Sequence, residues 1–174
     1  MDQEKAKAAK KNTKSYKTAD DKASFMAHDF LEHYETPTTM HRPMPYQALY
    51  ANPIALLTSS KKGLDAKAAL DFINISGFTH NEFQETFKTT VKTIHNHTNN
   101  HHKLDAALSE KILKSFALFE KGIAIFGSAH NFHTWLSVPA YGLGNQKPFD
   151  LMDTVTGITL IEEELIRLQY GDLA

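Results

Sequence analysis

The chain has 174 residues, of which 41% are hydrophobic and 22% charged, with a formal net charge of −1 and no cysteine. This length and composition indicate one or two small globular domains, and the lack of cysteine excludes disulfides, cysteine-ligated zinc, iron–sulfur clusters and a thiol nucleophile. No apolar run approaches the roughly 20 residues that a membrane span requires, and the Lys-rich N-terminus lacks the apolar core of a signal peptide. We therefore expect a soluble cytoplasmic protein that has no contact with a membrane.

Charge and proline are distributed unevenly. Residues 1–24 hold seven lysines against four acidic residues, whereas residues 145–174 hold two basic against six acidic residues. Such an acidic segment suits a basic partner, although a solvated helix face gives the same pattern.

Residues 1–22 carry almost no large apolar side chain and are predicted to be disordered, and 23–35 can form a short helix. Four prolines favour an extended connector over residues 36–60.

From Gly63 onward the pattern becomes helical. Leu64, Ala68, Phe72 and Ile75 recur at helix spacing, and Gly77 is a suitable end for that helix. A second helix over 80–87 follows a capping box made by Thr79 and Glu82, and a third begins after Thr89 or Thr90. Further helices are predicted over 106–126, between Ser128 and Pro139, over 148–152 and over 155–169, the last ending at Gly171.

These elements predict an all-α protein. We expect an N-terminal helix-turn-helix-like bundle followed by a small C-terminal helical domain. The predicted division is 1–60 for the Lys-rich tail and Pro-rich connector, 61–105 for the helix-turn-helix, and 106–174 for the C-terminal domain.

The two short helices around Lys88 have the length of a helix-turn-helix within residues 78–97. The residues that would face DNA are Lys88, Thr90, Lys92, His95 and Asn96. Three features weaken this interpretation: Gln84 replaces the usual small residue, Lys88 replaces the usual turn glycine, and the segment has no arginine to read guanine. We expect Lys88 to adopt a positive φ, at a cost of about 1 kcal/mol. A helical pair kept for packing or dimerisation is the alternative.

The polar clusters favour neither a metal site nor catalysis. Residues 95–102 hold four histidines, but Asn99 and Asn100 indicate a helix end and no carboxylate is interleaved. Asp150 and Asp153 stand where acids favour helix N-termini. The chain has no Gly-rich phosphate loop, no Gly-x-Ser-x-Gly and no His-Glu-x-x-His. We expect a protein that is not an enzyme and uses no metal and no cofactor.

The C-terminal third carries an ordered series of motifs. These are Trp135-Leu136, Pro139, Leu143-Gly144, Pro148, Asp150-Leu151, Thr154, Gly157 and Tyr170-Gly171. In this order and at this spacing, the segment resembles the C-terminal toxin-binding region of the Xre/ParS/MbcA-type antitoxins, and the resemblance extends more weakly upstream to about residue 61. The residues expected to hold the C-terminal helices together are Trp135, Pro139, Leu143, Gly144, Pro148, Thr154 and Gly157.

The resemblance implies an antitoxin whose partner is a RES-domain toxin that resembles ADP-ribosyltransferases and consumes NAD⁺. It also implies a homodimer within a hetero-oligomeric complex, and many members of the family repress their own operon by binding operator DNA. The antitoxin is expected to cover the toxin's active site, with the chain end blocking the NAD⁺ pocket. An acidic face at residues 162–164 and Arg167 are expected to remain free for the toxin. The predicted toxin-binding residues are Glu162, Glu163, Arg167, Tyr170, Gly171, Asp172, Leu173 and Ala174.

Two other interpretations stay open at this point. One is a helix-turn-helix transcriptional regulator without a toxin partner, and the other is a structural oligomerising module. The antitoxin interpretation is favoured because the best-matched motif lies in the C-terminal segment, whereas the candidate recognition helix departs most from its pattern.

Overall fold

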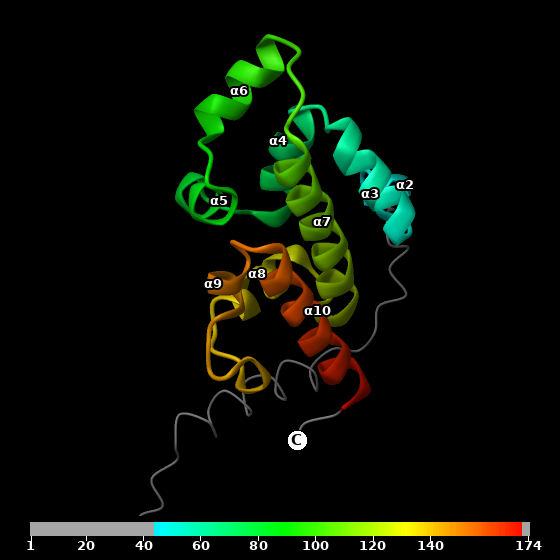
Figure 1. Ribbon diagram of the computed structural model, residues 1–174. Coiled ribbons are helices and arrows are strands. Elements are labelled where there is room, and N and C mark those ends of the chain that lie inside the picture. Colours follow the sequence, from blue (N-terminus) through cyan, green and yellow to red (C-terminus); the bar gives the residue numbers. More distant parts are fainter. Residues whose placement is uncertain (1–43, 172–174) are drawn as a thin grey trace, which may run out of the picture.

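The structure, a computed structural model, describes residues 44–171, and every regular element within this range is a helix (Figure 1). The helices are α2 (Gln47–Tyr50), α3 (Pro53–Lys62), α4 (Lys67–Ser76), α5 (His80–Phe87), α6 (Val91–Asn99), α7 (Ala106–Phe126), α8 (Ala129–Leu136), α9 (Pro148–Leu151) and α10 (Val155–Tyr170), with a 3₁₀ turn η1 (Tyr141–Leu143) between α8 and α9. The predicted all-α class is confirmed. The expectations for residues 1–22 and 23–35 lie outside the described residues.

Helix α7 forms the centre of the molecule. The Asp105 carboxylate caps it by accepting a hydrogen bond from the Leu108 N–H at 2.8 Å, and Gly127 ends it with a φ of 79°. Its 21 residues correspond to a length of about 31 Å. Helices α3, α4, α8 and α10 all pack against α7, which runs between the α4–α6 region and the α8–α10 region (Figure 1).

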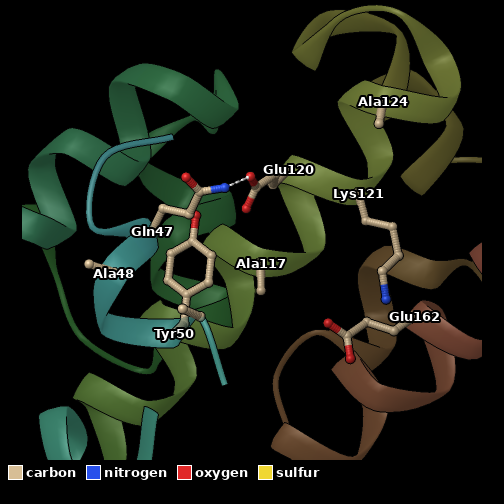
Figure 2. A pocket seen from close by; sticks show the side chains of 9 residues that line it. Gln47, Ala48, Tyr50, Ala117, Glu120, Lys121, Ala124 and Glu162 are labelled. Atoms are coloured by element: carbon tan, nitrogen blue, oxygen red, sulfur yellow. Dashed lines mark hydrogen bonds between the residues drawn. The ribbon is translucent and has the colours of Figure 1, made fainter. Parts of the chain in front are cut away.

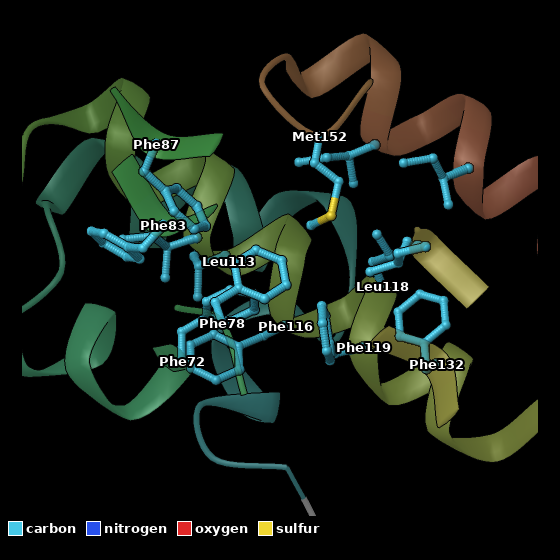
Figure 3. Close-up of a cluster of buried hydrophobic side chains, with 14 of the residues drawn as sticks. Phe72, Phe78, Phe83, Phe87, Leu113, Phe116, Leu118, Phe119, Phe132 and Met152 are labelled. Atoms are coloured by element: carbon cyan, nitrogen blue, oxygen red, sulfur yellow. The ribbon is translucent and has the colours of Figure 1, made fainter. Parts of the chain in front are cut away.

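The core is a continuous cluster of aromatic rings around α7 (Figure 3). Phe72 of α4 meets four other phenylalanine rings edge to face, with centroid distances of 5.2–5.5 Å. One of these rings, Phe119 of α7, also lies 4.9 Å from Phe132 of α8, and Phe132 in turn stacks on Trp135. Edge-to-face pairs add to the free energy gained by burying the rings. Through Phe119 and Phe132, the two ends of the molecule share one core.

The prediction of an extended connector is wrong over the described part of residues 36–60, since α2 and most of α3 lie there. Pro53 begins α3 instead of preventing it, and the Asn52 side chain caps the helix by accepting from the Ala55 N–H at 2.9 Å. The first turn of a helix tolerates proline because the N–H groups there have no partner within the helix. Both helices pack on α7, which supplies the tertiary contacts that stabilise such short segments.

Local signals place α5, α6 and the end of α4 as predicted, whereas α4 begins at Lys67 and Leu64 precedes it. The capping box of α5 is confirmed: the Glu82 N–H donates to the Thr79 hydroxyl at 3.2 Å, and the Thr79 N–H donates to the Glu82 carboxylate at 2.7 Å. The Thr90 hydroxyl caps α6. Lys88 ends α5 with a φ of 55°, so the expected left-handed conformation at this non-glycine residue is confirmed as well.

The C-terminal elements are held by small residues and caps. Trp135, Leu143 and Pro148 are buried, whereas Pro139 is exposed in the loop after α8. The Thr154 hydroxyl accepts the Gly157 N–H at 2.9 Å and so caps α10, and Gly144 ends η1 with a φ of 66°. A Cβ on Gly157 would lie 1.9 Å from the Leu151 carbonyl oxygen, so the close approach of α9 to α10 requires glycine there.

Candidate functional site

One side of α10 is exposed along its whole length. Its buried side consists of Gly157, Ile158, Ile161, Glu164, Leu165 and Leu168. On the other side, Leu160, Glu163, Arg167 and Tyr170 follow one another at intervals of three or four residues and form a single stripe. Leu160 is 43% exposed and Tyr170 is 79% exposed. Leu160 and Tyr170 give this side apolar surface that a partner can cover.

The turn η1 lies against α10 and presents a further aromatic ring. Tyr141 is 61% exposed, although the backbone around it is firmly fixed. The Ala140 N–H donates to the Gln146 carbonyl at 3.0 Å, the Leu143 N–H donates to the Ala140 carbonyl at 3.1 Å, and the Leu143 side chain is buried. The ring is therefore held at a defined place on the surface, next to the C-terminal half of α10.

Arg167, Glu164 and Gly142 form the contact between η1 and α10. Arg167 Nε donates to Glu164 Oε2 at 2.8 Å, its Nη2 lies 2.7 Å from the same oxygen, and Nη2 also donates to the Gly142 carbonyl at 3.3 Å. Glu164 is only 7% exposed. The expectation that residues 162–164 form one free acidic face is wrong, because successive helical residues point about 100° apart. Arg167 is exposed, as expected, but it is also paired with Glu164 within the protein.

Glu162 and Glu163 lie on different sides of α10. Glu163 belongs to the exposed stripe, whereas Glu162 lines an open groove of about 660 Å³ between α2, α7 and α10 (Figure 2). Small side chains such as Ala117 and Ala124 line the same groove, and Figure 2 shows the Lys121 side chain pointing toward the Glu162 carboxylate. The predicted toxin-binding residues are thus divided between two surfaces.

The remaining predicted toxin-binding residues follow at the end of α10. Gly171 ends the helix with a φ of 70° directly after Tyr170. Asp172, Leu173 and Ala174 lie outside the described residues.

The residues predicted to face DNA fall into two groups. Lys92, His95 and Asn96 are exposed on α6, opposite the buried Val91 and Ile94. The other two, Lys88 and Thr90, have contacts within the protein.

Lys88 is tied to the C-terminal elements, since its Nζ lies 3.3 Å from the Asp153 carboxylate, and Thr90 caps α6 as described above. Nearby, Lys111 of α7 donates to the carbonyl oxygens of Thr86 and Asp153 at 3.2 and 2.7 Å, and burial lowers the pKa of Lys111. The turn between α5 and α6 is therefore fastened to the loop between α9 and α10.

A second link joins α5 to α8. His133 Nε2 lies 3.1 Å from Glu82 Oε1, on the carboxylate that also completes the capping box. Partial burial opposes the charge on Glu82, but hydrogen bonds from the Thr79 N–H and hydroxyl, together with His133, hold the pKa of Glu82 below its usual value.

Within residues 44–171, no group of three or more His, Cys, Asp or Glu side chains is placed to hold a metal ion. The rings of His97 and His102 lie 5.8 Å apart at the end of α6. None of the described helices is both long and apolar enough to cross a bilayer.

The exposed stripe, η1 and the short helices around them lie in the segment that comparison with known proteins singles out. Residues 121–171 match the family described as the antitoxin Xre/MbcA/ParS C-terminal toxin-binding domain. This segment is therefore similar to the toxin-binding domain of the Xre/MbcA/ParS antitoxins, the resemblance that its motifs indicate. A relative from Sphingobium sp. (strain YBL2), the "Prs ADP-ribosylating antitoxin", is 27% identical over 142 residues, which cover 76% of this chain and 89% of the relative.

Sequence reasoning missed Tyr141, Gly142 and the role of Glu164. A signal for Tyr141 was present: it is a large aromatic residue in a loop between Pro139 and Gly144, with no helical repeat to bury it. The contact of Gly142 with Glu164 joins segments that are far apart in the sequence, and no local pattern indicates it.

Proposed function

We propose that the protein is the antitoxin of a type II toxin–antitoxin pair, and that its C-terminal domain binds and neutralises a RES-domain toxin that consumes NAD⁺. The observation that carries this proposal is the exposed stripe on α10, with Tyr141 beside it, inside the segment that matches a toxin-binding family. The name of the Sphingobium relative contains ADP-ribosylation, a reaction that uses NAD⁺, and this supports the assigned toxin chemistry.

Neutralisation in this proposal is a binding event in which no bond is made or broken. The α10 stripe and η1 supply the contact area, and residues 170–174 reach into the NAD⁺ pocket. Asp172 adds a negative charge that suits a site built for the phosphates of a dinucleotide. The protein acts in the cytoplasm, where NAD⁺ and the toxin are, as a homodimer within a larger complex with the toxin.

Co-expression with the toxin encoded by a neighbouring gene tests the proposal. We expect the two proteins to elute together in size-exclusion chromatography and the cellular NAD⁺ level to be preserved. A wild-type chain that neither binds nor protects would refute the antitoxin function.

Deletion of residues 170–174 separates binding from neutralisation. We expect the shortened protein to retain its fold, because Gly171 already ends α10, and to bind the toxin through the helical body. It should nevertheless fail to preserve NAD⁺. Full protection by the shortened protein would exclude insertion of residues 170–174 and would leave coverage by the helices as the mechanism.

A second function, repression of its own operon, is supported by the exposed side of α6. Lys92, His95 and Asn96 lie together there and α6 follows α5 after a short turn, as in a helix-turn-helix. The same surface without any toxin partner would make the protein a transcriptional regulator, which is the competing proposal.

A further inference from the structure

We infer that Tyr141 is an anchor of the toxin interface and that Arg167 acts through it, as a positioning residue that holds η1 against α10 instead of contacting acidic groups of the toxin. This inference rests on the proposed function and assigns two separate roles within its binding surface. The partner it requires is a protein surface with an apolar pocket that accepts a tyrosine ring.

The rigidity of η1 is the first step of the argument. An exposed aromatic ring on a mobile loop loses conformational freedom when a partner binds, whereas a ring on a fixed turn has already lost most of it. Tyr141 is of the second kind, because Ala140 and Leu143 beside it are buried and the backbone from Ala140 to Gln146 closes on itself through hydrogen bonds. Tyrosines in such settings are frequent among the residues that dominate binding energy.

The contact under Gly142 is the second step. A Cβ at this position would lie 2.0 Å from Glu164 Oε2, so the Glu164 carboxylate rests directly on the backbone next to Tyr141. A carboxylate this deeply buried requires a compensating charge. Arg167 supplies it and also donates to the Gly142 carbonyl, which ties the turn to the helix.

The resulting surface defines the chemistry of the partner. Leu160 and Tyr170 lie on the exposed side of α10, on the same stripe as Arg167, and Arg167 contacts η1 beside Tyr141. Because the charge of Arg167 is matched by Glu164 within the protein, the surface does not need an acidic group from the toxin at this point. Binding through Tyr141 and its neighbours should therefore depend only weakly on salt concentration.

The first test measures the affinity of Tyr141→Ala for the purified toxin. We expect a loss of about 30-fold or more, the level that marks a dominant interface residue, with an unchanged melting temperature. Ile54→Ala is the matched control, because Ile54 is 72% exposed on α3 and lies outside the matched segment; its affinity should equal that of the wild type. Wild-type affinity for Tyr141→Ala would overturn the inference, whereas a wild-type protein that does not bind would overturn the proposed function itself.

The second test is a double-mutant cycle that separates positioning from contact. Arg167→Gln should weaken toxin binding several-fold in the wild-type background and cause no further loss in the Tyr141→Ala background, because its effect is transmitted through η1. Additive losses would make Arg167 a direct contact and overturn its positioning role. If Arg167→Gln lowers the melting temperature, the cycle is repeated with Arg167→Lys, which keeps the positive charge beside Glu164. No further loss of affinity in the Tyr141→Ala background supports the positioning role, and additive losses overturn it.

Discussion

The exposed side of α6 and the exposed side of α10 differ in kind. On α6 the exposed residues are polar, with Lys92, His95 and Asn96 in water, whereas the α10 side and η1 expose Tyr141, Leu160 and Tyr170. Polar side chains are stable on any solvated helix, but exposed aromatic and aliphatic groups gain free energy when a partner covers them. The exposed groups at α10 therefore suit a protein partner, while the proposal of DNA at α6 depends on its polar side chains and on the arrangement of α5 and α6.

The largest expected effect lies in the packing that supports the α10 side. Trp135→Ala should lower the free energy of unfolding by about 3–5 kcal/mol, because the indole is buried against Phe126 and Phe132. Urea unfolding measures this loss. Tyr141→Ala, which removes an exposed ring, should change the same free energy by less than about 0.5 kcal/mol. Equal losses in the two variants would remove the distinction between core and interface aromatics.

Helix α5, which packs against α6, depends on the cap at its first turn for its stability. Thr79→Ala should cost about 1 kcal/mol, since it removes the hydroxyl that accepts the Glu82 N–H at the start of α5. Thermal unfolding monitored by circular dichroism gives the value, and Thr134→Ala, an exposed hydroxyl within α8, is the control. A loss as large as that of Trp135→Ala would show that caps contribute to α5 as much as packing contributes to α8.

A substitution in the strained turn before α6 should stabilise the protein, whereas the substitutions above destabilise it. Lys88→Gly should raise the free energy of unfolding by about 0.5–1 kcal/mol, because glycine adopts a positive φ without the clash of a Cβ. The lost ion pair with Asp153 is exposed and contributes little. Lys88→Ala removes the same ion pair but keeps the Cβ, so the free energy of unfolding of this variant should not rise. If the glycine and alanine variants change the free energy of unfolding by the same amount, the ion pair contributes more to stability than the backbone conformation does.

The link between α5 and α8 predicts a pH dependence. The pKa of Glu82 is lower in the folded protein than in the unfolded chain, so its contribution to stability is full above the unfolded pKa and is lost as the pH falls through the folded pKa. The difference in stability between the wild type and Glu82→Gln should shrink as the pH falls from about 5 through the folded pKa of Glu82. Urea unfolding at each pH measures it, and a constant difference would contradict the assigned role of the carboxylate.

The smallest effect concerns the α6 side as a DNA-binding surface. If operator DNA binds there, Lys92→Ala should reduce the slope of log affinity against log salt concentration by about one, the contribution of a single phosphate contact. Lys121→Ala, in the groove beside α10, is the matched control and should leave the slope unchanged. Identical slopes for the wild type, Lys92→Ala and Lys121→Ala would argue against DNA binding at this surface.

The local parts of the fold were predictable from the sequence, and the long-range parts were not. Thr79 with Glu82, Thr90 and Gly127 act on backbone groups a few residues away, so their pattern in the sequence placed the ends of α5, α6 and α7. Pro53 was misread, because a proline either breaks a helix or begins one, and the choice here depends on α7 being available for packing.

The candidate site shows the same limit. The spacing of residues on α10 follows from the helix, so the exposure of Glu163 and Tyr170 could be anticipated, while the separation of Glu162 onto the groove depends on where α2 packs. The burial of Glu164 depends on Gly142, which the fold brings to it from another element.

The position of α7 has a consequence for how the protein is turned over. Helix α10 packs directly on α7, and α6 is joined to α7 through α4 and α5. The core that connects the two regions through Phe119 is continuous, so neither surface has a separate set of buried contacts to keep it folded. Backbone amides in the middle of α7 should exchange with solvent only when the whole molecule opens. A protease that captures this open state therefore removes both surfaces in a single event.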